Sequence, residues 1–517
     1  MSELASGQPV AAEPRDTAVE VGDKGLKKNA IGFVSSTVIG VASTAPGYSL
    51  AASLGFVAAA VGAQSPAIMI LAFVPMLFIA TSYYYMNRAD PDCGTTFTWV
   101  TKAMGPRTGW VGGWAIVVAD VIVMANLAQI AGLYSFLLVG WQAAADSTWA
   151  VTTVGVLWIL IMTWIVARSV ELSARTQNFL LAAELATLAA FAITALVKVY
   201  ADPPPNSVKP SLSWFNPFEI SSFSAMVSGV LVAVFIYWGW DSTVTVNEET
   251  KDSSRTPGLG ALAATLILVA VYVIVSVAAQ AYGGVQQLVD NADDVLSVVG
   301  GEVFGSPLDK ILIIAVLTSA AASTQTTILP TARTSLSMAR AKALPAKFGE
   351  VHTRYFTPYF STWVMGIASI AWYVGLTLVS TNILFDSIAA LGLMIAFYYG
   401  ITGFACAIYY RKELTKSAKN FFFIGVSPVL GGLMLTGIFF KSAYDLASPA
   451  NSESGSSWFG VGPPLMITII FLLIGLVYMI YYSMKNPEFF NRKPEVADPA
   501  ILTGEKVAEA SFAAEED

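Results

Sequence analysis

The sequence is poor in the residues on which most enzymes and secreted domains depend. Only 12% of its 517 residues are charged, two are cysteine and one is histidine, whereas a soluble domain is about 25% charged. Two cysteines exclude a disulfide framework, and we expect Cys93 and Cys406 to be free thiols. The sequence contains neither a cluster of metal ligands nor a Gly-x-Ser-x-Gly motif. It therefore indicates neither an enzyme nor a bound cofactor.

Apolar residues are abundant instead. They make up 55% of the chain, and the mean hydropathy is +0.64. Lipid cannot satisfy backbone polar groups, so apolar runs of about 20 residues cross a bilayer as helices. We predict an all-α integral membrane protein of about twelve transmembrane helices. The expected spans are 30–60, 66–86, 108–140, 149–167, 175–200, 222–250, 259–281, 308–338, 359–380, 384–410, 420–440 and 463–484.

The distribution of basic residues predicts the orientation. All of the 28 lysines and arginines except Lys198, Lys209, Lys310 and Lys441 fall on the side of the predicted termini. Basic loops resist translocation, so both termini are expected in the cytoplasm and the chain in the plasma (inner) membrane. The net charge of −7 arises mainly from the tails and outer loops. We therefore expect no nucleic-acid partner, and the sequence does not indicate an oligomeric state.

Two predicted spans contain interruptions. In the first span, 39–47 gathers Gly, Ser and Thr around Pro46, and in the sixth, 235–245 places Gly239 among polar and aromatic residues. Proline removes a helical hydrogen bond, and non-helical backbone inside a membrane is tolerated only where it lines a buried cavity. Interruptions in the first helix of each set of five spans indicate a transporter built from inverted repeats, with its binding site at the breaks.

Several motifs resemble those of the amino acid-polyamine-organocation permeases. Residues 91–105 with 109–114 resemble that family's loop after the second span, 235–257 its sixth span, and 323–345 its eighth span. The resemblance implies a leucine-transporter-type fold, in which ten core helices form a 5+5 inverted repeat with discontinuous helices 1 and 6. Spans eleven and twelve would be accessory. The first break reads Val-Ala-Ser-Thr-Ala-Pro where many members carry Gly-Ser-Gly-Ile-Phe, so the resemblance implies no particular substrate.

This interpretation divides the chain into six segments. They are a disordered cytoplasmic tail at 1–27, a first repeat at 28–200, an outer loop at 201–221, a second repeat at 222–411, accessory spans at 412–486, and a second tail at 487–517.

The breaks supply the candidate substrate-binding residues. Free N–H groups at the first break suit a carboxylate, because the start of a helix carries a positive dipole end; the candidates there are Gly40, Ser43 and Thr44. At the second break, the carbonyls of Phe235, Ile236 and Tyr237 suit an ammonium, and the rings of Tyr237 and Trp238 could close over it. The alternatives are a simple proline kink and ordinary aromatic packing. Asp241 is a candidate ligand or a helix cap.

The candidate coupling residues are carboxylates and hydroxyls within the spans. Glu184 in the fifth span is costly as an ion unless it is paired or reaches water. Three roles are open for it: coupling to a proton or cation, a structural pair with Ser or Thr of the eighth span, and recognition of a cationic substrate. Asp120 lines the pathway or is a buried structural acid. Ser323 and Thr324, with Thr318 and Ser319, could hold Na⁺ or serve close helix packing.

Charged residues at the cytoplasmic mouth could form a salt-bridge gate or merely anchor the topology; they include Lys28, Arg88, Glu248, Glu249, Arg333 and Arg340. We predict a secondary transporter that carries an amino acid or related small amine by alternating access, with H⁺ as the coupling ion. The alternatives are an amine or polyamine exchanger, a Na⁺-coupled symporter and a solute sensor that does not transport.

Overall fold

The computed structural model describes residues 20–292, 294–379 and 382–498, and within these ranges it contains helices and no strands. It has 11 helical segments that are long and apolar enough to cross a membrane. The first of them, Phe33–Ala89, is 57 residues long, and because a span needs about 20 residues, it accommodates two passes that meet at Gly62–Gln64. The predicted count of twelve spans is confirmed.

The spans follow one another along the chain. Spans one to five are α1 (Phe33–Thr44) with α2 (Pro46–Val61), α3 (Ser65–Ala89), α5 (Pro106–Val139), α7 (Thr148–Arg168) and α8 (Val170–Ala201). Spans six to ten are α9 (Phe223–Tyr237) with α10 (Ser242–Thr245), α11 (Thr256–Asp290), α13 (Asp309–Arg340), α14 (Tyr359–Val379) and α15 (Asn382–Tyr409). The last two are α17 (Ser427–Asp445) and α18 (Pro463–Lys485).

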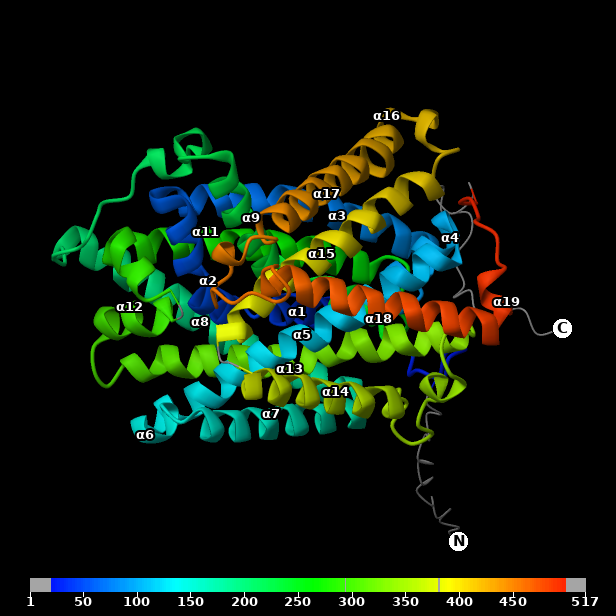
Figure 1. Ribbon diagram of the computed structural model, residues 1–517, viewed down its shortest axis with the longest axis horizontal. Helices are drawn as coiled ribbons and strands as arrows, with labels where there is room; N and C mark the ends of the chain where they lie inside the picture. The colour runs from blue at the N-terminus through cyan, green and yellow to red at the C-terminus, as the bar shows by residue number, and fades with distance from the viewer. Residues whose placement is uncertain (1–19, 293, 380–381, 499–517) are drawn as a thin grey trace, which may run out of the picture.

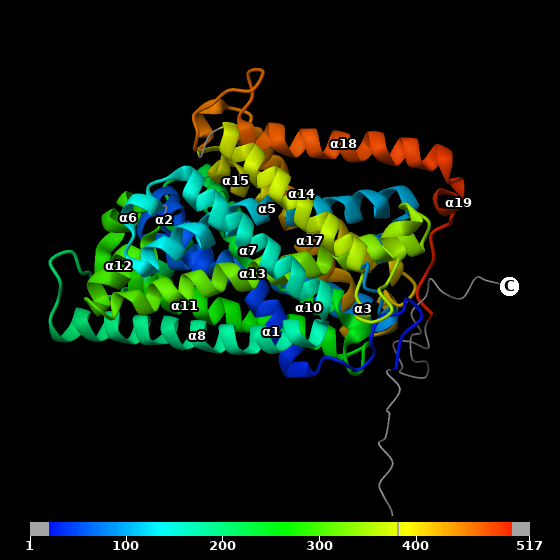
Figure 2. The ribbon, with the colours of Figure 1, turned by 90° about the horizontal axis from the view of Figure 1, so that it is seen from below.

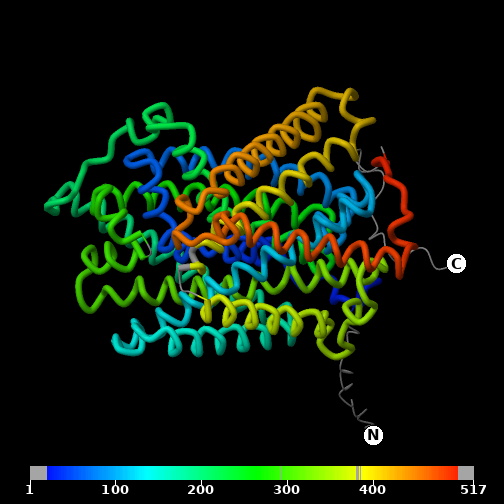
Figure 3. Tube along the Cα trace, viewed as in Figure 1, coloured from blue at the N-terminus to red at the C-terminus, as the bar shows by residue number. Residues whose placement is uncertain are grey.

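Shorter helices lie between and after the spans: α4 (Thr96–Met104), α6 (Gln142–Ala145), α12 (Val295–Phe304), α16 (Ala418–Asn420) and α19 (Pro487–Phe490). The spans run along the long axis of the molecule, and both ends of the described chain lie at the same end of the bundle (Figures 1 and 3). We call this end the terminal side. An even number of spans requires this placement.

The spans differ in how deeply they are buried. The most apolar windows of α13 and α15 are each 78% buried, whereas that of α18 is 28% buried, and α18 runs along an outer edge of the bundle (Figure 2). The two interrupted spans pack on each other, with α2 against α9 and α1 against α10. Since four spans lie between them along the chain, they run in opposite directions.

The structure differs from the predicted disorder of the two tails over residues 20–27 and 487–498. In the first segment Leu26 is buried, and Lys24 forms ion pairs with Asp92 and Glu248 on the terminal side. In the second, Phe489 and Phe490 are buried, and the N–H of Ala497 donates to the carbonyl of Tyr409. Two aromatic rings and one paired lysine are sufficient to dock segments whose composition is otherwise polar. The rest of both predicted tails lies outside the described residues.

Candidate functional site

The first span is interrupted at one residue. Ala45 adopts φ 47° and ψ 67°, which ends α1, and Pro46 occupies the first turn of α2. Left-handed backbone is unfavourable for an alanine, and proline is tolerated at a helix start because its missing N–H would have no helical partner there. The predicted break in 39–47 is therefore present, and its position is set by Pro46.

The second interruption is longer and lies directly against the first. The chain leaves α9 at Trp238, whose backbone is extended, and turns at Gly239 with φ 116°. A Cβ atom at Gly239 would lie 2.8 Å from the carbonyl carbon of Ser43, so only glycine permits this approach. The hydroxyls of Ser43 and Ser242 are hydrogen bonded at 2.8 Å. The two breaks thus form one structural unit.

A narrow cavity, with room for about one water molecule, lies at this junction. Of the predicted site residues, Ser43, Thr44, Phe235, Trp238 and Ser323 line it. The cavity also has four lining residues that the sequence reasoning did not name: Tyr48, Ser49, Val123 and Leu127. Tyr48 and Ser49 directly follow the break. Pro46 and Gly47, which mark the break in the sequence, could therefore have identified them. Hydroxyls and aromatic rings dominate the lining.

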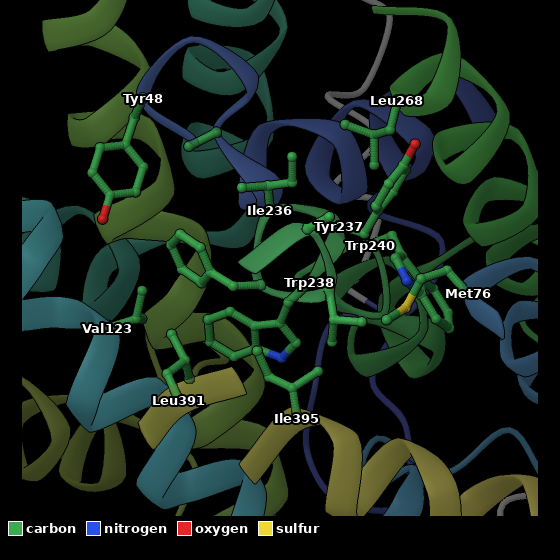
Figure 4. Close-up of a cluster of buried hydrophobic side chains, with 14 of the residues drawn as sticks. Tyr48, Met76, Val123, Ile236, Tyr237, Trp238, Trp240, Leu268, Leu391 and Ile395 are labelled. Carbon is green, nitrogen blue, oxygen red and sulfur yellow. The ribbon is translucent and has the colours of Figure 1, made fainter. Parts of the chain in front are cut away.

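Tyr237 and Trp238, which are neighbours in the second break, point in different directions. The hydroxyl of Tyr237 donates to the carbonyl of Met69 at 3.0 Å, and its ring turns toward Leu268, whereas the ring of Trp238 lies toward Leu391 and Ile395 (Figure 4). Tyr237 is not among the lining residues of the cavity, so the structure gives no contact that would support the predicted closing of its ring over a substrate.

The second-break carbonyls already have protein donors. The carbonyl of Ile236 accepts from the hydroxyl of Tyr272, and that of Phe235 accepts from the N–H of Trp238 at 3.0 Å. Each carbonyl oxygen has two lone pairs, so it can accept a second hydrogen bond. Of these two residues, only Phe235 lines the cavity.

Asp241 affects the cavity indirectly, through a chain of hydrogen bonds. Its carboxylate accepts from the hydroxyls of Tyr399 at 2.9 Å and Tyr398 at 3.3 Å. The indole N–H of Trp238 in turn donates to the hydroxyl of Tyr398. The aspartate therefore fixes the orientation of a lining ring and does not itself line the cavity.

Three further predicted residues lie behind the cavity wall. A Cβ atom at Gly40 would lie 2.5 Å from the Cγ2 of Thr243 and 3.0 Å from the carbonyl oxygen of Trp240, so this glycine allows α1 to pack on the second break. The hydroxyl of Thr324 donates to the carbonyl of Ala320 in its own helix. Asp120 is buried and accepts from the hydroxyl of Thr331, the geometry of a structural acid.

Glu184 lies at the first break. Its Oε1 accepts from the N–H of Gly47 at 2.7 Å and from the hydroxyl of Ser319 at 2.8 Å. The side chain is buried, and within the described part of the chain its Oε2 has no hydrogen-bond partner. Ser319 belongs to the eighth span, so the pairing considered as a structural alternative is present. The contact with Gly47 was not foreseen, because the two residues are 137 positions apart.

Two of the four hydroxyls considered for Na⁺ have partners outside their own helix. Ser319 donates to Glu184, and Ser323 donates to the carbonyl of Ser43 at 2.8 Å. Both hydroxyls thus connect α13 to elements of the first break. Their oxygens keep lone pairs that a cation could use.

Ion pairs close the terminal side of the bundle. The ammonium of Lys24 lies 2.7 Å from carboxylate oxygens of both Asp92 and Glu248. Arg333 and Glu249 form a buried pair with two hydrogen bonds, of 2.6 and 2.9 Å. The sequence reasoning named Glu248, Glu249 and Arg333 for this gate but missed Lys24 and Asp92.

The members of the Lys24 cluster shift one another's pKa values. Burial alone would lower the pKa of Lys24, but Asp92, Cys93 and Glu248 hold it well above the ordinary value. Burial would raise the pKa of Asp92, yet Lys24 and the donors around it lower it. Burial and the adjacent Glu248 raise the pKa of the Cys93 thiol. Asp92, Cys93 and Glu248 approach one another within 4.8 Å, as metal ligands would, but the lysine ammonium already supplies the positive charge there.

An all-helical bundle of twelve spans, with two interrupted helices meeting at a small buried cavity, defines a polytopic membrane transporter and not an enzyme. The chain belongs to the amino acid permease family, whose model matches residues 28–482. It is thus a member of the amino acid-polyamine-organocation superfamily, which confirms the resemblance read from its motifs.

Three relatives illustrate the range of the family. The branched-chain amino acid permease of Lactococcus lactis is 27% identical over 38% of this chain and 44% of its own length. The methylthioribose transporter of Bacillus subtilis is 23% identical over 83% of this chain and 88% of its own. The low-affinity putrescine importer of Escherichia coli is 22% identical over 84% of this chain and 90% of its own.

Proposed function

We propose that this permease carries an amino acid or a related small amine across the plasma membrane by alternating access. The observation that carries the proposal is the meeting of the two breaks at one cavity, where Gly239 touches Ser43 and residues of both breaks form the wall. A change at either break would alter the cavity directly. Relatives named for branched-chain amino acids and for putrescine support this substrate range.

The chemistry of the wall suits an ammonium group. The carbonyl of Phe235 lies at the negative end of the α9 dipole, and the faces of Trp238 and Tyr48 offer aromatic surfaces to a cation. The hydroxyls of Ser43, Thr44 and Ser323 can accept further hydrogen bonds. The apolar side chains of Val123 and Leu127 also line the cavity and would contact the body of the substrate.

We place the terminal side in the cytoplasm. Lysines and arginines concentrate there, including Arg88 and Arg340 at helix ends and Lys102 in α4, and segments rich in such residues are retained on the inner face of the membrane. The Lys24 and Arg333 ion pairs would then close the inner end of the pathway.

We propose H⁺ as the coupling ion and Glu184 as its site. The carboxylate holds the first N–H of α2 at the break, and hydrogen bonds to a charged acceptor are about twice as strong as those to a neutral one. Taking up a proton would therefore loosen the break. This links proton binding to the geometry of the cavity wall, as coupled transport requires.

Uptake by proteoliposomes tests this function. With the lumen neutral and the outside at pH 5.5, a panel of radiolabelled amino acids and amines should include one that accumulates above its outside concentration. An inward Na⁺ gradient should have no effect. Glu184→Gln should abolish accumulation driven by the pH gradient, while Glu171→Gln, at the partly exposed start of the same helix, should behave like the unmodified protein. Accumulation that follows Na⁺ and ignores pH would contradict the coupling.

A further inference from the structure

The N-terminus of α2 is the only part of the first break that offers backbone donors with a favourable dipole for an anion, and its donors are already in use. Pro46 has no N–H. The N–H of Gly47 donates to Glu184 at 2.7 Å, that of Tyr48 to the hydroxyl of Ser319 at 3.2 Å, and that of Ser49 to the carbonyl of Ala45 at 2.8 Å. The sequence predicted that N–H groups at the start of this half-helix would suit a substrate carboxylate, although the candidates named there were Gly40, Ser43 and Thr44.

The carboxylate of Glu184 therefore occupies the N-terminus of α2, where a substrate carboxylate would otherwise bind. Glu184 is 1% exposed, and the hydroxyl of Ser319 adds a second donor to the same oxygen, Oε1. A substrate carboxylate would have to displace Glu184 or lie beside it. Two carboxylates sharing a buried site repel each other so strongly that one of them must take up a proton.

The cavity wall offers only uncharged donors in place of these groups, such as the hydroxyl of Tyr48, which has no hydrogen-bond partner among the described residues. Its lining residues carry hydroxyls, aromatic rings and aliphatic groups, and none of those that the structure describes is a lysine, arginine or histidine. By contrast, a cation finds acceptors there, including the carbonyl of Phe235 and the hydroxyl oxygens of Ser43 and Ser323. Asp241 adds a carboxylate behind Trp238, reached through Tyr398.

We propose, building on the proposed function, that the substrate is a small organic amine without a carboxylate. Its ammonium would bind among the acceptors of the second break, and its body would lie against Tyr48, Val123 and Leu127. Glu184 takes the place at the first break that a substrate carboxylate would otherwise fill.

Matched pairs of ligands test the proposal on the unmodified protein. Binding to the purified permease in lipid nanodiscs would be measured by thermal stabilisation for leucine against 3-methylbutylamine and for ornithine against putrescine. Leucine methyl ester completes the set, because it keeps the amine and loses the charged carboxylate. At least one amine should bind at least tenfold more tightly than its parent amino acid, and the ester should follow the amine.

Variants at Glu184 give a second measurement. Glu184→Ala releases the donors of Gly47 and Ser319, and it should raise the affinity for the parent amino acid at least tenfold relative to its methyl ester. Glu171→Ala, on the same helix but with a partly exposed side chain paired to Lys27, should leave both affinities unchanged. If Glu184→Ala does not fold, the ligand pairs on the unmodified protein still decide the question.

The outcomes separate this inference from the function on which it rests. Amino acids that bind more tightly than both their amines and their esters would overturn the inference and leave amino acid transport standing. Failure of every amine and every amino acid to bind would overturn both.

Discussion

The Lys24 cluster allows a quantitative prediction about how the terminal side opens. Lys24 belongs to the segment before α1, and its ammonium bridges Asp92 after α3 and Glu248 after α10. Neighbouring contacts tie the same regions together: the N–H of Ile31 donates to the carbonyl of Glu249, and the N–H of Lys251 to the carbonyl of Ile31. Separation of the two interrupted spans on this side requires the lysine to leave at least one carboxylate.

The expected magnitude follows from burial. The side chains of Lys24, Asp92 and Glu248 are 4%, 0% and 7% exposed. Removing one partner of a buried ion pair costs about 3–5 kcal/mol, because the remaining charge has no compensation. Since about 1.4 kcal/mol corresponds to a factor of ten, Lys24→Met should raise the population of the open terminal side about 100-fold or more relative to the closed one.

Cys93 provides a natural reporter for the assay. Its thiol is fully buried, 3.6 Å from the ammonium of Lys24, so a polar maleimide can reach it only after opening. The labelling rate would be measured in a Cys406→Ala background. It should rise about 100-fold or more in Lys24→Met and stay unchanged in the matched control Lys28→Met, whose side chain is exposed in the same segment.

The reasoning would be refuted by a labelling rate that changes less than threefold in Lys24→Met. An equal increase in Lys28→Met would refute it as well, because the effect would then belong to the general charge of the segment and not to the buried ion pair.

Three further predictions concern stability, measured as the free energy of unfolding in mixed micelles. Glu249→Leu should cost about 3–5 kcal/mol by leaving Arg333 unpaired, and adding Arg333→Met should restore most of it; a purely additive double variant would disprove the pairing. Gly40→Ala should cost about 1–3 kcal/mol because its Cβ has no room, and an unchanged stability would contradict the close packing of the breaks. The stability difference between the unmodified protein and Lys24→Met should be largest at neutral pH and shrink in acid: Lys24 and nearby donors lower the pKa of the buried Asp92 from its ordinary 3.8, and the pair stabilises only while the carboxylate is ionised, so a difference that grows in acid would be inconsistent with it.

Much of the fold followed from local composition. The twelve spans were predictable because a membrane segment needs a long apolar run whatever its neighbours are. The break at Ala45 was predictable for the same kind of reason, since Pro46 acts on its own helix. Gly239 marked the second break in the same way. The motifs at 91–105 and 323–345 then indicated the family, which the match over residues 28–482 confirms.

Contacts between distant segments were harder to predict from the sequence. The sequence ranked Tyr237 as a binding residue, but the helical phase at the end of α9 turns its hydroxyl toward Met69. It treated Lys24 as one of many topology-setting charges, although a buried pair with Asp92 distinguishes it. Neither outcome is encoded in a local pattern, because each depends on the rotation of one helix against another.

The sequence by itself determined the membrane class, the number of spans, the two interruptions and the residue types available at them, because lipid makes each span satisfy its backbone alone. The tertiary structure alone decided which residues share the cavity and that Glu184 lies against the amide of Gly47. The physical reason is the distance along the chain. A carboxylate in the fifth span meets the first break only after the helices have packed, and side-chain partners inside a bundle are chosen by that packing and not by sequence neighbours.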